Sequence, residues 1–215
     1  MSQSMNHEIV AALIRRDDGA ILLVRQQRPD DPAPTWALPG GVVEAGELLD
    51  EALTREMREE TGLDVTAIGP LLYVAQFHNP TGHLRGDWTD RPAGYSATAF
   101  VFAASGRAGE SAVADPDTFV SAARFVPLAE AIALLDAHPL RVMREPVVAY
   151  LRGETAPTTV WLYRRLPDGT DTLLSRAWLC GSRRPDAGPL TPLCASGRRP
   201  RDAAVLAIRH HETRR

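Results

Sequence analysis

Apolar and polar positions along the chain predict several short strands and three helices. Two apolar runs, 9–14 and 20–24, flank Arg15-Arg16-Asp17-Asp18-Gly19, and an Asp-Gly pair between such runs is typical of a β-hairpin. Trp36-Ala37-Leu38 is expected to be a short extended stretch that Pro39-Gly40-Gly41 stops. Longer apolar runs predict further strands at residues 68–76, 97–103 and 119–126.

Helical periodicity is clearest in residues 48–61, where Leu49, Leu53 and Met57 recur every four positions. Gly62 is expected to end this helix in a left-handed conformation. Two more helices are predicted at 128–135 and 140–151, the second interrupted by Pro146. Strands mixed with a few helices favour an α/β (α+β) fold or a layered α/β/α architecture.

The chain divides by composition into three parts. Residues 1–153 have the pattern of one domain, residues 154–180 contain the signature of an extra β-hairpin, and residues 181–215 form an Arg/Pro/Gly-rich tail. We expect the tail to be flexible, either as a solvated basic extension or in contact with nucleic acid or another subunit.

Composition and charge narrow the class of protein. The 215 residues are 44% hydrophobic and 24% charged, which is globular, and no run approaches the roughly 20 apolar residues that span a bilayer. The first eight residues are polar and resemble no secretory signal, so we expect Cys180 and Cys194 to be reduced and the protein to be cytoplasmic.

Charge is distributed unevenly. Residues 1–163 carry −9 and residues 164–215 carry +6, giving a net charge of −3, and every basic residue is Arg. An acidic body argues against specific nucleic-acid binding, which needs a cationic surface. If this body binds phosphates, it is expected to do so through cations.

Glu56, Glu59 and Glu60 lie at i, i+3 and i+4, so a helix would present them on one face. Carboxylate oxygens at this density suit Mg²⁺ or Mn²⁺, although a solvated helix face has the same appearance. Arg55 can pair with Glu59 or with Glu51 on the same helix. The backbone of Gly40-Gly41, without side chains, can approach a ligand closely.

The spacing around these residues is more specific. Gly41 is followed after five residues by Glu47, and after seven more by Arg55-Glu56-Met57-Arg58-Glu59-Glu60-Thr61-Gly62-Leu63. This pattern resembles the Nudix box, with every defining position present. The lead-in, residues 36–40, and the order of strands and helices extend the resemblance over roughly residues 8–150.

The resemblance to the Nudix hydrolase superfamily implies an α/β/α sandwich with a mixed sheet and hydrolysis of a nucleoside diphosphate linked to another group. Its metal ligands would be Glu56, Glu59, Glu60 and the carbonyl of Gly40, with Mg²⁺ or Mn²⁺ as cofactor. Arg55 and Glu47 would orient the cluster, and a carboxylate such as Glu56 or Glu59 can act as the base.

One departure leaves the base unassigned. Many members carry an additional glutamate in a later loop or strand, and the corresponding residues 119–125 contain no carboxylate. Glu110, Asp115 and Asp117 are candidates to replace it.

Substrate choice stays open between a nucleoside triphosphate or damaged nucleotide and an ADP-ribose-like or dinucleotide compound. Arg25, Arg85 and Trp88 are candidate substrate-binding residues, because arginine binds phosphate and tryptophan stacks on bases. The partner is a small nucleotide, no membrane is expected, and a homodimer is compatible with the sequence. The alternative function is a non-catalytic, nucleotide-sensing Nudix module. Isoprenyl diphosphate isomerase is disfavoured because both cysteines lie beyond the predicted catalytic domain of residues 1–153.

Overall fold

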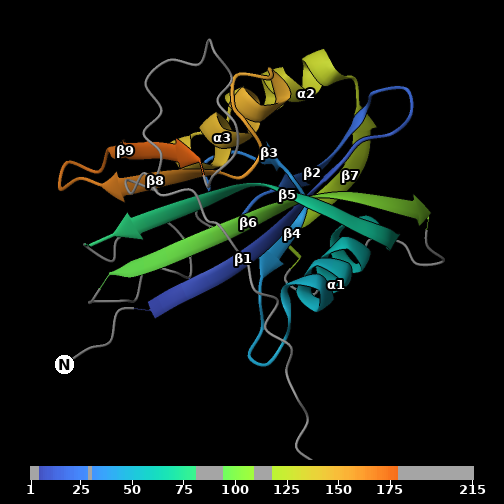
Figure 1. The fold of residues 1–215 in the computed structure, drawn as a ribbon, viewed down its shortest axis with the longest axis horizontal. Coiled ribbons are helices and arrows are strands. Elements are labelled where there is room, and N and C mark those ends of the chain that lie inside the picture. Colours follow the sequence, from blue (N-terminus) through green and yellow to red (C-terminus); the bar gives the residue numbers. More distant parts are fainter. Residues whose placement is uncertain (1–4, 29–30, 81–93, 109–117, 179–215) are drawn as a thin grey trace, which may run out of the picture.

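The computed structural model describes residues 5–28, 31–80, 94–108 and 118–178. Its strands form two sheets with helices on both sides (Figure 1), which confirms the predicted mixed α/β/α architecture. The strands are β1 (Met5–Ile14), β2 (Ile21–Gln26), β3 (Thr35–Ala37), β4 (Gly40–Val42), β5 (Leu63–Asn79), β6 (Tyr95–Ala108), β7 (Val120–Val126), β8 (Thr159–Arg165) and β9 (Asp171–Trp178). The helices are α1 (Leu49–Thr61), α2 (Leu128–Asp136) and α3 (Arg141–Leu151).

The larger sheet has the strand order β4-β1-β6-β5-β8-β9, and the smaller one has the order β3-β2-β7. β1 pairs with β6 in parallel and β5 pairs with β8 in parallel, whereas the other pairs are antiparallel. The larger sheet is therefore mixed, as predicted.

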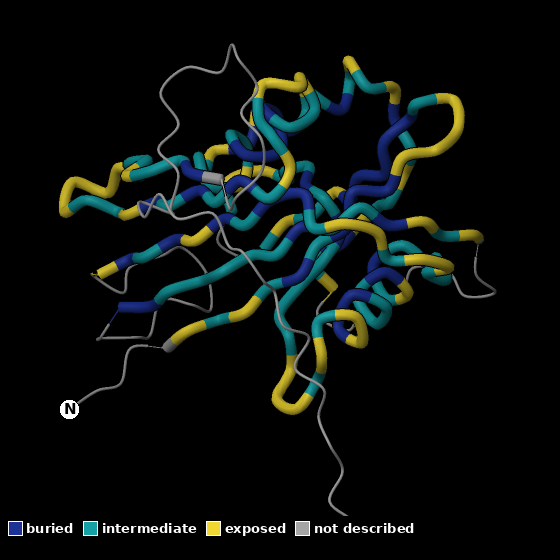
Figure 2. Tube along the Cα trace, viewed as in Figure 1, coloured by how far each residue is buried: buried dark blue, intermediate teal, exposed yellow. Residues whose placement is uncertain are grey.

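Two apolar cores lie on opposite sides of the sheets. One packs α2 and α3 against side chains such as Leu23, Phe77 and Trp161, and the other packs α1 against Val10 and Leu22. Buried positions recur along the strands and along the inner side of α1 (Figure 2). Burying these apolar side chains is the main driving force that fixes the layers.

The predicted hairpin of residues 9–14 and 20–24 is wrong in its pairing. The chain does reverse at Asp17-Asp18-Gly19, where Gly19 has φ +85°. Only one bridge, between Arg15 and Ile21, joins the two strands before they enter different sheets. β1 pairs instead with β4 and β6, and β2 with β3 and β7, because packing with distant segments outweighs local turn chemistry.

Two smaller predictions also need correction. Pro39-Gly40-Gly41 was expected only to stop the preceding stretch, but Gly40–Val42 form a strand of their own, β4, which pairs with β1. Pro146 does not interrupt its helix, because α3 continues from Arg141 to Leu151 with Pro146 buried inside it. The expected left-handed cap at Gly62 is confirmed, with φ +68° and an N–H that donates to the Arg58 carbonyl.

The additional hairpin expected in residues 154–180 is present as β8 and β9. The tail at 181–215 lies outside the described residues, and the predicted domain boundaries stay predictions. None of the described helices has the length and apolar character needed to cross a bilayer.

Candidate active site

The acidic face of α1 is positioned by the apolar face of the same helix. Ala52, Leu53 and Met57 are fully buried against the sheets. Because residues three and four apart share a face, burying these three turns Arg55, Glu56 and Glu59 toward the strand β4 and the loop after it.

Arg55 is the centre of the site. Its Nε and Nη2 atoms donate to the two carboxylate oxygens of Glu47, over 2.8 and 2.9 Å. Its Nη1 atom donates to Glu56 Oε1 at 2.8 Å and to Glu59 Oε2 at 3.2 Å. The fifth bond runs from Nη2 to the Val42 carbonyl at 3.0 Å, so one guanidinium joins the helix, the loop and β4.

Charge on these groups is strongly stabilised. Hydrogen bonds from Arg55, followed by one from the backbone N–H of Glu44, lower the pKa of Glu47 to about 2. The bond to Glu47 is also the main reason that the pKa of Arg55 is raised. The guanidinium thus supplies the countercharge that lets three carboxylates stand close together.

Glu60 has a different position. It is 8% exposed, and its Oε2 atom accepts a hydrogen bond from the N–H of Gly40 at 2.7 Å. This bond fastens the last turn of α1 to the first residue of β4. The spacing Gly40-x19-Glu60 gives no local signal of such a contact, which sequence reasoning missed.

The two glycines of β4 leave room that a side chain would fill. A Cβ atom at Gly40, whose φ is +147°, would overlap the Val10 carbonyl oxygen. A Cβ atom at Gly41 would overlap the Glu56 carboxylate, which therefore lies directly against the β4 backbone.

Carboxylate oxygens are the donors that Mg²⁺ and Mn²⁺ prefer, so the chemistry of Glu56, Glu59 and Glu60 fits the predicted ion. Within the described residues, however, no group of three or more His, Cys, Asp or Glu side chains is gathered as a ready-made metal cluster. In this arrangement Arg55 supplies the countercharge to Glu56 and Glu59, and the Gly40 N–H donates a hydrogen bond to Glu60.

Of the other predicted site residues, Arg25 alone falls within the described part of the chain. Arg25 is exposed on β2 and shares the alternation of Leu23, whose side chain packs in the core on the α2 side. Arg85 and Trp88 lie outside the described residues, as do Glu110, Asp115 and Asp117.

Comparison with known proteins agrees with this geometry. The NUDIX domain family model matches residues 5–150, more than half of the chain. The chain belongs to the Nudix family. A solved NUDIX hydrolase from Nitrosomonas europaea superposes with a TM-score of 0.52 at 24% identity, covering 71% of this chain and 93% of that one, which supports the Nudix fold.

Two curated relatives match shorter segments. A CTP pyrophosphohydrolase of Escherichia coli is 37% identical over 87 residues, which is 35% of this chain and 64% of that protein. An ADP-ribose pyrophosphatase of Methanocaldococcus jannaschii is 39% identical over 77 residues, or 35% and 44% of the two chains. The Nudix chain thus spans about half to two thirds of the length of these relatives.

Proposed function

We propose that the chain is a Nudix hydrolase that cleaves the diphosphate linkage of a nucleoside diphosphate derivative. The observation that carries this proposal is the Arg55-centred set of hydrogen bonds, which holds Glu47, Glu56 and Glu59 together, with Glu56 against the bare backbone of Gly41. The names of both curated relatives, pyrophosphohydrolase and pyrophosphatase, support the reaction type.

The reaction adds water across one bridge. A water oxygen bonds to one phosphorus, the bond from that phosphorus to the bridging oxygen breaks, and two phosphate esters or ions leave with the protons of water. Glu56 or Glu59 would accept a proton from that water, and Arg55 holds both carboxylates in place by donating to them.

Mg²⁺ or Mn²⁺ would be held by Glu56, Glu59 and Glu60, with the Gly40 carbonyl as a further ligand. When bound, such an ion neutralises phosphate charge and lowers the pKa of bound water. An acidic site needs this countercharge to bring a polyanionic substrate close. A cytoplasmic location and a homodimer stay predictions.

The test is a substrate screen with identified products. The purified chain should convert nucleoside triphosphates or nucleoside diphosphate derivatives such as ADP-ribose to phosphorylated products in Mg²⁺ or Mn²⁺, and excess chelator should stop it. Full turnover in chelator would refute the metal role. Binding of nucleotides without any turnover would favour the sensing module instead.

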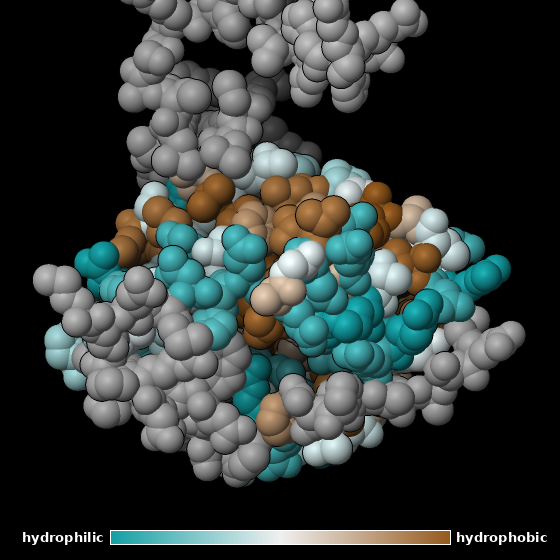
Figure 3. Space-filling view, turned by 90° about the horizontal axis from the view of Figure 1, so that it is seen from below, coloured by the Kyte–Doolittle hydropathy of each residue, from teal (hydrophilic) through white to brown (hydrophobic). Residues whose placement is uncertain are grey.

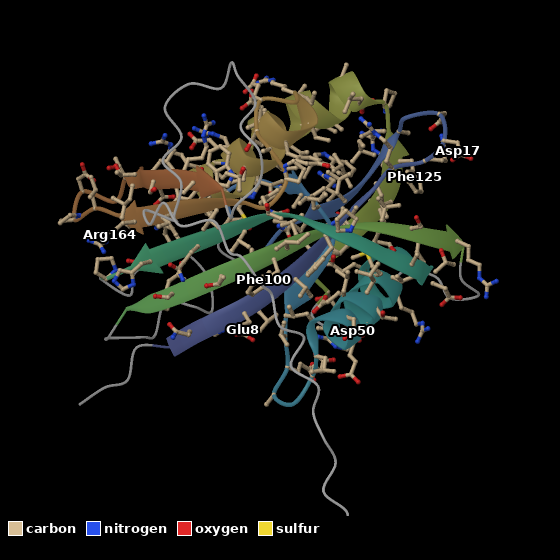
Figure 4. All side chains as sticks on the ribbon, in the orientation of Figure 1. Glu8, Asp17, Asp50, Phe100, Phe125 and Arg164 are labelled. Atoms are coloured by element: carbon tan, nitrogen blue, oxygen red, sulfur yellow. The ribbon has the colours of Figure 1, made fainter. Side chains whose placement is uncertain are left out.

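A matched pair of variants locates the chemistry on α1. Glu59→Gln keeps the shape of the side chain but removes its charge, and should lower kcat by orders of magnitude. Asp50→Asn changes an exposed acid on the first turn of the same helix (Figure 4) and should retain the wild-type rate. Equal rates for both variants would exclude Glu59 from the reaction.

A further inference from the structure

The C-terminal hairpin, β8 and β9, follows the segment that the family model matches, yet it extends the same sheet. β8 pairs in parallel with β5 along Tyr73–His78. The hairpin is therefore an addition of this chain to the sheet that carries the candidate active site.

One row of paired residues crosses the sheet from the site to the hairpin. Directly paired residues of neighbouring strands place their side chains on one face of a sheet. The row is Gly41, Val10, Phe100, Val74 and Val160. Four strand spacings separate its ends, about 19 Å in all. Because α1 covers this row at Val10, a ligand that reaches from Gly41 to the hairpin would pass beside the helix, over the neighbouring row of Glu8, Thr98, Gln76 and Leu162.

The row lies on the face to which α1 belongs. Val10 is buried against Leu53 and Met57 of α1, and the Glu56 carboxylate lies over Gly41 at the same end. The opposite face of β8 is closed, because Trp161 and Tyr163 are buried in the core under α3. Side chains that alternate with these two, such as Val160 and Leu162, point to the α1 side.

Away from α1, this face is partly exposed and chemically mixed. Val74, Phe100, Val160 and Leu162 are half-buried, whereas Gln76 is exposed and donates to the Thr98 hydroxyl at 3.1 Å. Glu8 on β1 and Phe100 on β6 lie on neighbouring strands beside α1 (Figure 4). Seen from the α1 side, a hydrophobic band borders a hydrophilic area (Figure 3).

We propose that Val160 and Leu162 of the hairpin are specificity-determining residues, which contact the nucleoside end of a substrate whose diphosphate lies at Gly41 and Glu56. This inference rests on the proposed function. The apolar row suits the faces of a nucleobase, and the neighbouring amide of Gln76 and hydroxyl of Thr98 suit its polar edge. A second copy of the chain on this face is the competing occupant.

The experiment compares two leucines of the same hairpin. Leu162→Thr removes apolar contact from the proposed surface and keeps a residue suited to a strand, whereas Leu174→Thr changes a leucine that is 52% exposed on β9. Calorimetry measures the Kd of ADP, CDP, GDP and UDP in Mg²⁺ for the wild type and both variants. Leu162→Thr should weaken the preferred nucleotide about tenfold and compress the ranking, because lost apolar contact costs 10- to 200-fold in such sites. Leu174→Thr should leave the ranking unchanged.

An unchanged ranking in Leu162→Thr, or no nucleotide binding by the wild type, overturns the inference. Light scattering measures the molecular mass of the wild type and both variants. If the mass of Leu162→Thr differs from the other two, the inference is also overturned and the face is assigned to a second copy of the chain. If Leu162→Thr does not fold, Leu162→Ile keeps the volume and should shift the ranking in the same direction. Turnover separates the two proposals: hydrolysis with no effect of Leu162 refutes only the inference, whereas Leu162-dependent binding without hydrolysis refutes only the proposed function.

Discussion

Arg165 and Asp171 form an ion pair between β8 and β9, with 2.8 Å between Nε and Oδ1 and only 13% and 5% of the two side chains exposed. Arg141 of α3 donates to the Asp171 carbonyl and also pairs with Glu145, which accepts a hydrogen bond from the Tyr163 hydroxyl. Two of these hydrogen bonds tie the hairpin to α3, from Arg141 to the Asp171 carbonyl and from the Tyr163 hydroxyl to Glu145.

Asp171→Asn should therefore lower the free energy of unfolding by about 1–3 kcal/mol, since it leaves a partly buried guanidinium without its counter-ion. Chemical denaturation measures the loss. Asp136→Asn is the matched control, because its pair with Arg152 is about half exposed and should contribute well under 1 kcal/mol. Equal losses in the two variants would show that the hairpin pair has no special weight.

Truncation tests the same coupling on a larger scale. Removing residues 182–215 should leave catalysis and unfolding nearly unchanged. Removing residues 154–215 should destabilise the domain severely, because Trp161 and Tyr163 are part of the core that packs β5 and α3. A stable, active fragment ending at residue 153 would show that the hairpin is a separable appendage.

The sequence predicts what short-range physics determines. The spacing of apolar residues predicts helix α1 and its Gly62 cap. The pair of Arg55 with Glu59 follows from i, i+4 spacing, and its pair with Glu47 follows from the fixed motif. The partners of β1 were not predictable in this way, because the pairing of a strand depends on burial against segments far away in the chain. Glu60 is a similar case, since its bond to Gly40 depends on how the helix docks against β4.

Arg55→Lys should lower kcat/KM by about 10–100-fold, which is the usual cost of losing a residue that orients metal ligands. Lysine keeps the charge but cannot make the fork to Glu47 or reach Glu56, Glu59 and Val42 together. Steady-state kinetics measures the change, and Arg58→Lys, whose side chain is 58% exposed on the same helix, is the control. A wild-type rate in Arg55→Lys would remove Arg55 from the positioning role.

Acid should weaken the loop that precedes α1. The pKa of Glu47 is about 2 in the folded protein, below its ordinary value of 4.5. A lowered carboxylate pKa stabilises the folded state above the unfolded pKa, and that contribution disappears as pH falls from about 4.5 to about 2. The stability difference between wild type and Glu47→Gln should be constant above pH 5 and shrink below it. A difference that stays constant down to pH 2 would contradict the pairing with Arg55.

Alanine should lower stability at one of the two neighbouring glycines of β4 and lower activity at the other. At Gly40, a Cβ atom meets the rigid backbone of β1 and φ is +147°, so Gly40→Ala should cost at least about 2 kcal/mol of stability and often prevent folding. At Gly41, the atoms nearest the new Cβ atom belong to the Glu56 carboxylate, the end of a flexible side chain, so Gly41→Ala should fold while displacing that carboxylate and lowering kcat. Denaturation and kinetics on both variants separate the effects, with Gly46→Ala as a control for positive φ in open space. A folded Gly41→Ala variant with full activity would show that the contact between Glu56 and the β4 backbone is dispensable for the reaction.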